Sequence, residues 1–341
     1  MSKEETKVKV ALVGCGYWGP NLARNFHQLA DVELVACCDL DAGNLQRMET
    51  LYAARGTTDL DTILSNPEIE AVALATPVGT HYQIARQALL AGKHVLVEKP
   101  LTTSSAEGQD LIDLARQQER VLMVGHVFEY NPAVLKIKDL IGEGQIGQVY
   151  YLYSNRVNLG RVQSDINALW SIAPHDVSIA LLLLDQLPEE VSARGACYLN
   201  GEVEDVVFMT MFFPGGVMAH VQASWLDPSK VRRMTIVGSE KMILYDDVAS
   251  EGKVRIYDKG VYRKGDSIYG EFQYKLHSGD IYIPKIDMSE PLRNECAHFV
   301  ECVRSGSTPR TDGENGLRVV RVLEAAQRSL SRGGETVRLN P

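Results

Sequence analysis

The sequence predicts an α/β Rossmann domain followed by an α+β domain with a large, mainly antiparallel open sheet. Short apolar runs alternate with amphipathic helical segments up to Gly125, and a glycine-rich turn follows the first run. After Gly125, strand-like runs follow one another with few helices between them. A chain of 341 residues is long for a single hydrophobic core, so we expect two domains, residues 1–126 and 127–341.

The first domain reads as strands joined by helices, which favours right-handed crossovers and a parallel sheet. The expected helices begin near Gly19, Ala42, Asp61, His81 and Ser104. The expected strands are Val8–Val13, Val32–Asp39, Ala71–Ala75, His94–Glu98 and Val121–Val124.

The second domain opens with a helix over Asn131–Ile141, has another near Ala173–Leu184, and ends in a helix whose apolar face includes Leu317 and Leu330. The segment Phe213–Val217 contains Pro-Gly-Gly and predicts a hairpin, because glycine allows the positive φ that such turns need. The expected strands are Val149–Ser154, Val191–Tyr198, Val206–Phe213, Val217–Trp225, Met234–Val237 and Met242–Tyr245.

Composition excludes several classes of function. A net charge of −9 argues against general nucleic-acid binding, and no apolar run reaches the roughly 18–20 residues that span a bilayer. The charged N-terminus lacks the apolar core of a signal peptide, so we expect a cytoplasmic protein. The six cysteines are scattered without metal-binding spacing, and we expect no metal site.

A dinucleotide fingerprint follows the first strand, with Gly14, Gly16 and Gly19 in the order GxGxxG and Tyr17 and Trp18 between the last two. The first glycine permits a tight turn, the second lets a pyrophosphate approach the backbone, and the third lets helix and strand pack closely. We expect these five residues to form a cofactor-binding loop; the alternative is a glycine turn without a ligand.

Asp39 ends the second strand, 20 positions after Gly19. A carboxylate there accepts hydrogen bonds from ribose hydroxyls and repels a 2′-phosphate, which favours NAD over NADP. The alternative is a solvated loop aspartate.

An extended segment resembles the Gfo/Idh/MocA (glucose–fructose oxidoreductase / inositol dehydrogenase) family. It comprises Ala75-Thr76-Pro77, then His81, then Ala91 to Glu98-Lys99-Pro100. The resemblance implies a cofactor site that includes Thr76, Pro77 and His81. It also implies that Glu98 contacts the nicotinamide ribose and that Lys99 reaches the oxygen of the reacting carbon.

Further along, Trp170-Ser171-Ile-Ala-Pro-His175-Asp176 resembles the catalytic segment of the same family. The resemblance makes His175 a general base, since imidazole titrates near working pH. The family commonly has Asp four residues before this His, where the present chain has Ser171. Ser171 can still hydrogen-bond a substrate, and the adjacent Asp176 is a second candidate.

The region from Ser154 to Trp170 resembles a subgroup of nucleotide-sugar 3-dehydrogenases that act on UDP-N-acetylglucosaminuronate. In that reading Arg156 and Arg161 pair a uronate carboxylate or a diphosphate, and Tyr130 and Asn131 line the sugar pocket. The alternatives are ordinary surface arginines and a packing role for Tyr130.

Three functions stay open at this point: a nucleotide-sugar dehydrogenase, a dehydrogenase of free sugars or inositol, and a non-catalytic NAD-binding regulatory or scaffold subunit. The substitution at Ser171 favours the last. The run Val217–Trp225 is too apolar for a wholly solvated sheet, so one face of the sheet needs cover. The family resemblance implies a homodimer or homotetramer packed through such sheets.

Overall fold

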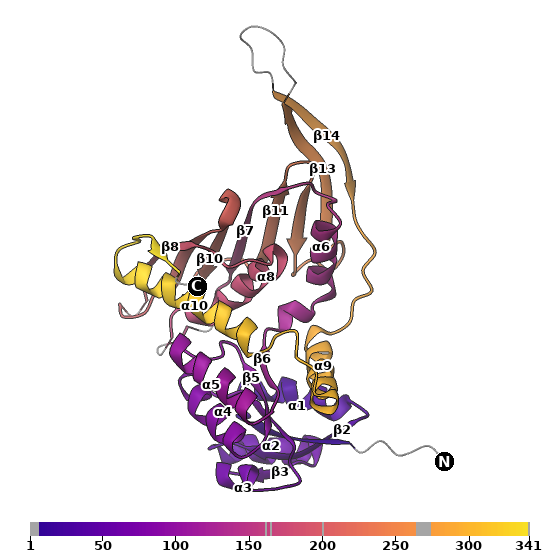
Figure 1. The fold of residues 1–341 in the computed structure, drawn as a ribbon, viewed down its shortest axis with the longest axis vertical. Coiled ribbons are helices and arrows are strands. Elements are labelled where there is room, and N and C mark those ends of the chain that lie inside the picture. The colour runs from indigo at the N-terminus through magenta and orange to yellow at the C-terminus, as the bar shows by residue number, and fades with distance from the viewer. Residues whose placement is uncertain (1–6, 161, 164–165, 200, 264–273, 340–341) are drawn as a thin grey trace. The chain divides into compact units, whose positions relative to one another are not determined.

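The computed structural model describes residues 7–160, 162–163, 166–199, 201–263 and 274–339. The chain forms two compact units (Figure 1), one made of Met1–Tyr130 with Ser289–Arg321 and the other of Asn131–Met288 with Val322–Pro341. The sequence predicts a second domain of residues 127–341, whereas Ser289–Arg321 belongs to the first unit.

The first unit is built on a six-stranded sheet in the order β3-β2-β1-β4-β5-β6, and every described pairing in it is parallel. This is the Rossmann arrangement, and it confirms the predicted fold class. All the strands therefore end at the same carboxyl edge. Their bounds are β1 (Val8–Val13), β2 (Val32–Cys38), β3 (Arg55–Thr57), β4 (Ala71–Leu74), β5 (His94–Glu98) and β6 (Leu122–Gly125).

Helices cover this sheet, and one of them comes from far along the chain. The helix α9 packs against α1 and β1, where Phe299 and Phe26 are fully buried with ring centroids 6.4 Å apart. This burial explains why Ser289–Arg321 belongs to the first unit. The helices are α1 (Gly19–Gln28), α2 (Ala42–Tyr52), α3 (Leu60–Leu64), η1 (Val78–Thr80), α4 (His81–Leu90), α5 (Ser105–Gln117), η2 (Val127–Tyr130) and α9 (Pro291–Ser305).

The second unit is built on a nine-stranded sheet in the order β14-β13-β12-β11-β7-β10-β9-β8-β15. Only β7 and β10 pair in parallel among the described pairings, and the rest are antiparallel. The predicted mainly antiparallel sheet is thus confirmed. The strands are β7 (Val149–Val157), β8 (Glu190–Ala196), β9 (Val206–Phe212), β10 (Met218–Ser224), β11 (Val231–Gly238), β12 (Met242–Asp246), β13 (Val254–Arg263), β14 (Tyr274–Tyr282) and β15 (Val337–Arg338).

Helices α6 (Pro132–Gly142), α7 (Ala168–Ile172) and α8 (Pro174–Leu184) contact this sheet, and α6 and α8 lie over the same face of it (Figure 1). The hairpin predicted at Phe213–Val217 joins β9 to β10 through η3 (Pro214–Gly216), where Gly215 and Gly216 have φ of 76° and 83°. Helix α10 (Gly313–Ser331) begins in the first unit and ends in the second. No helix in the described part of the chain is long and apolar enough to cross a bilayer.

Candidate active site

The glycine loop after β1 has the three properties that a dinucleotide site needs. Gly14 has φ +91°, and a Cβ there would lie 2.6 Å from the carbonyl of Ala75. A Cβ on Gly19 would lie 2.1 Å from the Gly14 carbonyl oxygen, whereas one on Gly16 would meet no atom within 4 Å. Gly14 and Gly19 are therefore needed for packing. Gly16 instead faces open space beside the N-terminus of α1, where a phosphate can approach the backbone.

Asp39 follows β2 and helps to hold this loop. Its Oδ2 accepts a hydrogen bond from the Cys15 N–H at 2.6 Å, and its Oδ1 accepts one from the Asp41 N–H at 2.8 Å. The side chain is half-buried. Asn44 Nδ2 also donates to Oδ1, at 3.4 Å. A carboxylate has about four acceptor sites, so these three bonds leave capacity for a ribose hydroxyl. The residues present fit NAD.

Tyr17 and Trp18, the two aromatic residues of the loop, are placed differently. Tyr17 is 83% exposed, while the half-buried Trp18 donates a hydrogen bond from Nε1 to Oε1 of Glu98. The other Glu98 oxygen accepts from the Lys99 N–H at 3.2 Å. Burial raises the pKa of Glu98 to about 7, although the Lys99 charge and the Trp18 hydrogen bond oppose that rise. The loop is thereby tied to the end of β5.

Lys99 lies at the carboxyl edge, and its peptide bond to Pro100 is cis. Its positive charge lowers the pKa of both Glu98 and His126, so the ammonium group acts within this cluster. A cation at the edge where a dinucleotide site opens can stabilise an oxygen that is losing its proton.

The His81 side chain bridges the segment after β4 and the segment after β5. Its Nδ1 lies 2.8 Å from the Pro100 carbonyl oxygen and its Nε2 lies 2.9 Å from that of Thr76. The ring is buried, and burial lowers its pKa. The Thr80 hydroxyl donates to the carbonyl of Pro77 at 2.7 Å, and its Oγ1 lies 2.8 Å from the Thr76 hydroxyl oxygen. The geometry favours His81 as the residue that positions Thr76 and Pro100.

In the second unit, Ser171 and His175 share one side of a helical segment. Ala173 joins α7 to α8 with helical φ and ψ of −66° and −21°, so these residues stand four positions apart in a continuous helical path. Both side chains are half-exposed, whereas the intervening Ala173 and Pro174 are buried. A hydroxyl and an imidazole are therefore presented together.

Asp176 points the other way and forms a buried ion pair with Arg156 of β7. Arg156 Nε donates to Asp176 Oδ2 at 2.5 Å and Nη2 donates to Oδ1 at 3.3 Å, with both side chains under 10% exposed. Burial lowers the pKa of Arg156, but the Asp176 charge outweighs it and the net shift is upward. The guanidinium is thus committed to a partner inside the unit.

Tyr130 and Asn131 are also buried. Asn131 begins α6, where its Oδ1 accepts from the Ala133 N–H at 2.9 Å and its Nδ2 donates to the Tyr245 hydroxyl at 3.2 Å. Tyr130, in the first unit, has its hydroxyl 3.1 Å from Thr311 Oγ1. These contacts support packing and capping roles. Arg161 lies outside the described residues.

Two buried polar residues of the first unit, Glu295 and His126, were not among the predicted site residues. Glu295 on α9 is fully buried, and burial together with the nearby charges of Glu98 and Glu129 raises its pKa. His126 directly follows β6 and is also fully buried. Its position after a strand of a parallel sheet was the signal available in the sequence.

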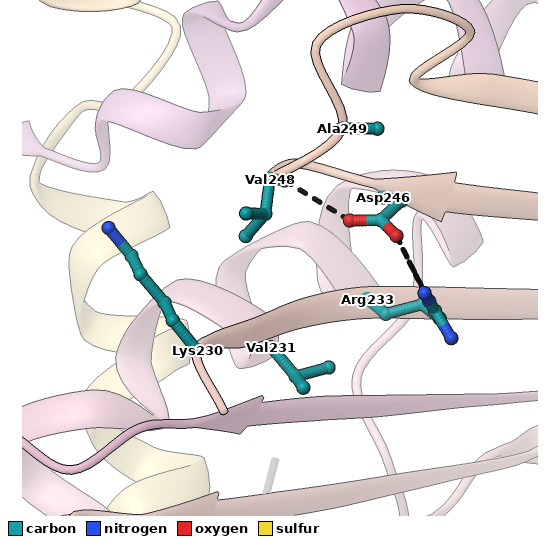
Figure 2. Close-up of a pocket in the computed structure, with 6 residues that line it drawn as sticks. All are labelled: Lys230, Val231, Arg233, Asp246, Val248 and Ala249. Carbon is teal, nitrogen blue, oxygen red and sulfur yellow. Dashed lines mark hydrogen bonds and ion pairs between the residues drawn. The ribbon is translucent and has the colours of Figure 1, made fainter. Parts of the chain in front are cut away.

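A separate hollow in the second unit is lined by residues of β11, β12 and the turn after β12 (Figure 2). Two of its charged side chains pair with each other, since Arg233 Nη2 lies 2.8 Å from Asp246 Oδ2, and Lys230, just before β11, also lines the hollow. Burial raises the Asp246 pKa, but the Arg233 hydrogen bond and charge turn the net shift downward. We assign no chemistry to this hollow.

The parallel sheet, the glycine turn at α1 and the Glu98–Lys99 pair at the carboxyl edge define an NAD-dependent oxidoreductase. More particularly, the chain belongs to the Gfo/Idh/MocA family. The family model for an oxidoreductase with an NAD-binding Rossmann fold matches residues 8–126, and the model for the Gfo/Idh/MocA C-terminal domain matches residues 134–244. The predicted family, fold and cofactor are confirmed.

Several relatives indicate the range of this family. UDP-N-acetylglucosamine 3-dehydrogenase of Acidithiobacillus ferrooxidans is 26% identical over 254 residues, covering 74% of this chain and 78% of the relative. The scyllo-inositol 2-dehydrogenase (NAD(+)) of Bacillus subtilis is 26% identical over 318 residues, 89% of each chain. The crystal structure of GenD2 from gentamicin A biosynthesis in complex with NAD superposes with a TM-score of 0.83 at 25% identity, covering 98% of this chain and 97% of that one.

Proposed function

We propose that this oxidoreductase oxidises a hydroxyl-bearing carbon of a nucleotide sugar, with C3 of UDP-N-acetylglucosaminuronate as the leading candidate. The observation that carries the proposal is the placement of Lys99 beside Glu98 at the carboxyl edge of the Rossmann sheet. The similarity to a UDP-N-acetylglucosamine 3-dehydrogenase supports the substrate class.

Bound NAD supplies the hydride acceptor. We assign the remaining chemistry to two side chains. The Lys99 ammonium stabilises negative charge on the substrate oxygen as its proton leaves, and the His175 imidazole takes that proton. Ser171, four residues before His175, hydrogen-bonds the same substrate without carrying a charge.

On the cofactor side we propose that Gly16 and the α1 N-terminus bind the pyrophosphate, Asp39 binds the adenosine ribose, and Glu98 binds the nicotinamide ribose. Tyr17, which is exposed, is proposed to cover the cofactor.

We propose an indirect role for Arg156. Because its guanidinium pairs with Asp176 inside the unit, it supports the start of α8, which carries His175. A second candidate function, oxidation of a free sugar or inositol, is favoured by this commitment of Arg156 and by the inositol dehydrogenase relative.

NADH formation across a panel of sugars tests the proposal and separates it from the second candidate. The panel contains UDP-N-acetylglucosamine, UDP-N-acetylglucosaminuronate, myo-inositol, scyllo-inositol and free N-acetylglucosamine. We expect turnover with a UDP-sugar and its loss in Lys99→Ala and His175→Ala, with ADP-ribose binding retained. Lys138→Ala, at an exposed position of α6, is the matched control.

Turnover with inositol alone selects the second candidate. NAD binding without turnover of any panel member selects a non-catalytic subunit, for which the serine at position 171 is the supporting feature. Near-normal turnover in both alanine variants refutes the role assignment.

We also propose that the protein is a homodimer or homotetramer, assembled through the sheet face of the second unit opposite α6 and α8. Tyr151, Tyr153, Phe208 and Met218 project from that face and are 40–45% exposed. Met218 pairs with Tyr151 across β10 and β7, and the Tyr151 and Tyr153 rings stack with centroids 6.4 Å apart, so these three side chains are neighbours on that face. Light scattering of the wild type and of Tyr153→Lys tests this: a wild-type monomer refutes it.

A further inference from the structure

His126 and Lys99 occupy equivalent places at the carboxyl edge of neighbouring strands. In the parallel pairing of β5 with β6, Glu98 lies opposite Gly125, so Lys99 and His126 are the next residues of their strands. A tight turn holds His126 there: its N–H donates to the Val124 carbonyl at 2.8 Å, and its own carbonyl accepts from the Glu129 N–H at 2.9 Å. Ligands of open parallel sheets bind outside this edge.

The His126 side chain is buried and its hydrogen-bonding groups are unused. It is 0% exposed, and neither ring nitrogen has a hydrogen-bond partner among the described residues. Burial and the Lys99 charge lower its pKa to about 3, so the ring is neutral at working pH and offers one donor and one acceptor. His81, the other fully buried histidine described in this unit, differs from His126 because each of its two ring nitrogens faces a carbonyl oxygen.

A core that only needed to fill this space would use an apolar side chain. Each unmet buried donor or acceptor costs about 1–3 kcal/mol, whereas a phenylalanine of similar shape carries no such penalty. The two unused nitrogens therefore indicate a partner that arrives with the ligand. Because the ring is neutral and Lys99 already supplies positive charge, the matching ligand group is an uncharged one.

We propose that His126 is a ligand-binding residue, whose imidazole hydrogen-bonds an uncharged hydroxyl or carboxamide group held next to Lys99. This rests on the proposed function, in which Lys99 faces the reacting oxygen. Two sources supply such a group: the carboxamide of the nicotinamide ring and a hydroxyl of the sugar. His126 orients the group and transfers no proton, because the neutral ring resists protonation.

The test uses the full-length protein with His126→Phe and His126→Gln. Phenylalanine keeps the ring and removes both polar atoms, while glutamine keeps a donor and an acceptor. Three quantities are measured: the Tm without ligand, the Kd for NADH and for ADP-ribose, and the KM and kcat for the sugar that the panel identifies. ADP-ribose is the matched control ligand, because it lacks nicotinamide.

For His126→Phe we expect a Tm at or above that of the wild type and an unchanged ADP-ribose Kd. A rise of tenfold or more in the NADH Kd assigns the partner to the carboxamide, and the same rise in the sugar KM assigns it to a hydroxyl. His126→Gln recovers most of the lost affinity.

The proposal is overturned if His126→Phe leaves the NADH Kd and the sugar KM within twofold of the wild type. It is also overturned if ADP-ribose binding falls as much as NADH binding, since that indicates general damage to the unit. If His126→Phe fails to fold, the comparison of His126→Ala with His126→Gln decides by the same readouts. A wild type that oxidises none of the sugars refutes the proposed function, and the NADH measurement then decides alone on His126.

Discussion

Replacing Gly16 by alanine should separate cofactor binding from folding. A Cβ at this position meets no atom within 4 Å, and the backbone φ lies outside the positive range that disfavours L residues. The protein without ligand therefore tolerates the methyl group. It should gain about 0.4–1 kcal/mol, because alanine restricts the unfolded chain.

With NAD bound, the same methyl group occupies the space in which the pyrophosphate approaches the backbone. Overpacking of this kind costs about 1–3 kcal/mol, which corresponds to a roughly 5–150-fold rise in Kd. Gly19→Ala should behave in the opposite way: its Cβ would lie 2.1 Å from the Gly14 carbonyl oxygen, so folding itself is impaired.

Isothermal titration with NADH and ADP-ribose gives the Kd, and denaturant unfolding without ligand gives the free energy of unfolding. Gly142→Ala is the matched control, since a Cβ there also meets no atom within 4 Å and the residue lies in the second unit. The reasoning is refuted if Gly16→Ala binds both ligands like the wild type. It is also refuted if Gly16→Ala destabilises the free protein as much as Gly19→Ala.

Two predictions concern stability. Asp176→Asn should lower the free energy of unfolding by about 3–5 kcal/mol, because it leaves the buried Arg156 charge without its carboxylate. Asp246→Asn, at the partly exposed pair in Figure 2, should cost under about 1 kcal/mol in the same urea titration; equal losses would contradict this. His94 Nδ1 accepts from the Val121 N–H at 3.0 Å, and burial with the Arg120 charge lowers its pKa from 6.5 to about 4. Since the folded pKa is the lower one, this contribution is present above pH 6.5 and is lost as the pH falls through about 4. His94→Gln should flatten that loss by up to about 3 kcal/mol, and an unchanged acid titration would refute it.

Much of the fold follows from local signals in the sequence. The alternation of strands and helices up to Gly125 and the Pro-Gly-Gly hairpin before Val217 depend on short-range periodicity and turn chemistry, and both are observed. The position of Ser289–Arg321 was not anticipated. The apolar face of α9 is buried through a tertiary contact between Phe26 and Phe299, which lie about 270 positions apart. Local sequence signals do not encode this contact.

The candidate site was partly predictable for a related reason. Gly14 directly follows β1 and Glu98 is the last residue of β5, so the ends of these two strands place both motif residues at the carboxyl edge. Arg156 was different. Alternation along β7 places it on the buried, helix-covered face, and only the packing of α8 reveals Asp176 as its partner. The partner of this guanidinium cannot be read from one strand.

The chain passes between its two units at three points: after Tyr130, before Ser289 and within α10. A fragment that stops at residue 130 would therefore lack α9 and leave the surface around Phe26 uncovered. Exchange of C-terminal domains between members of this family therefore requires inserting a segment into the host chain rather than joining two fragments end to end. A donor segment must replace residues 131–288 and also match the last turns of α10, where the host's own helix crosses over.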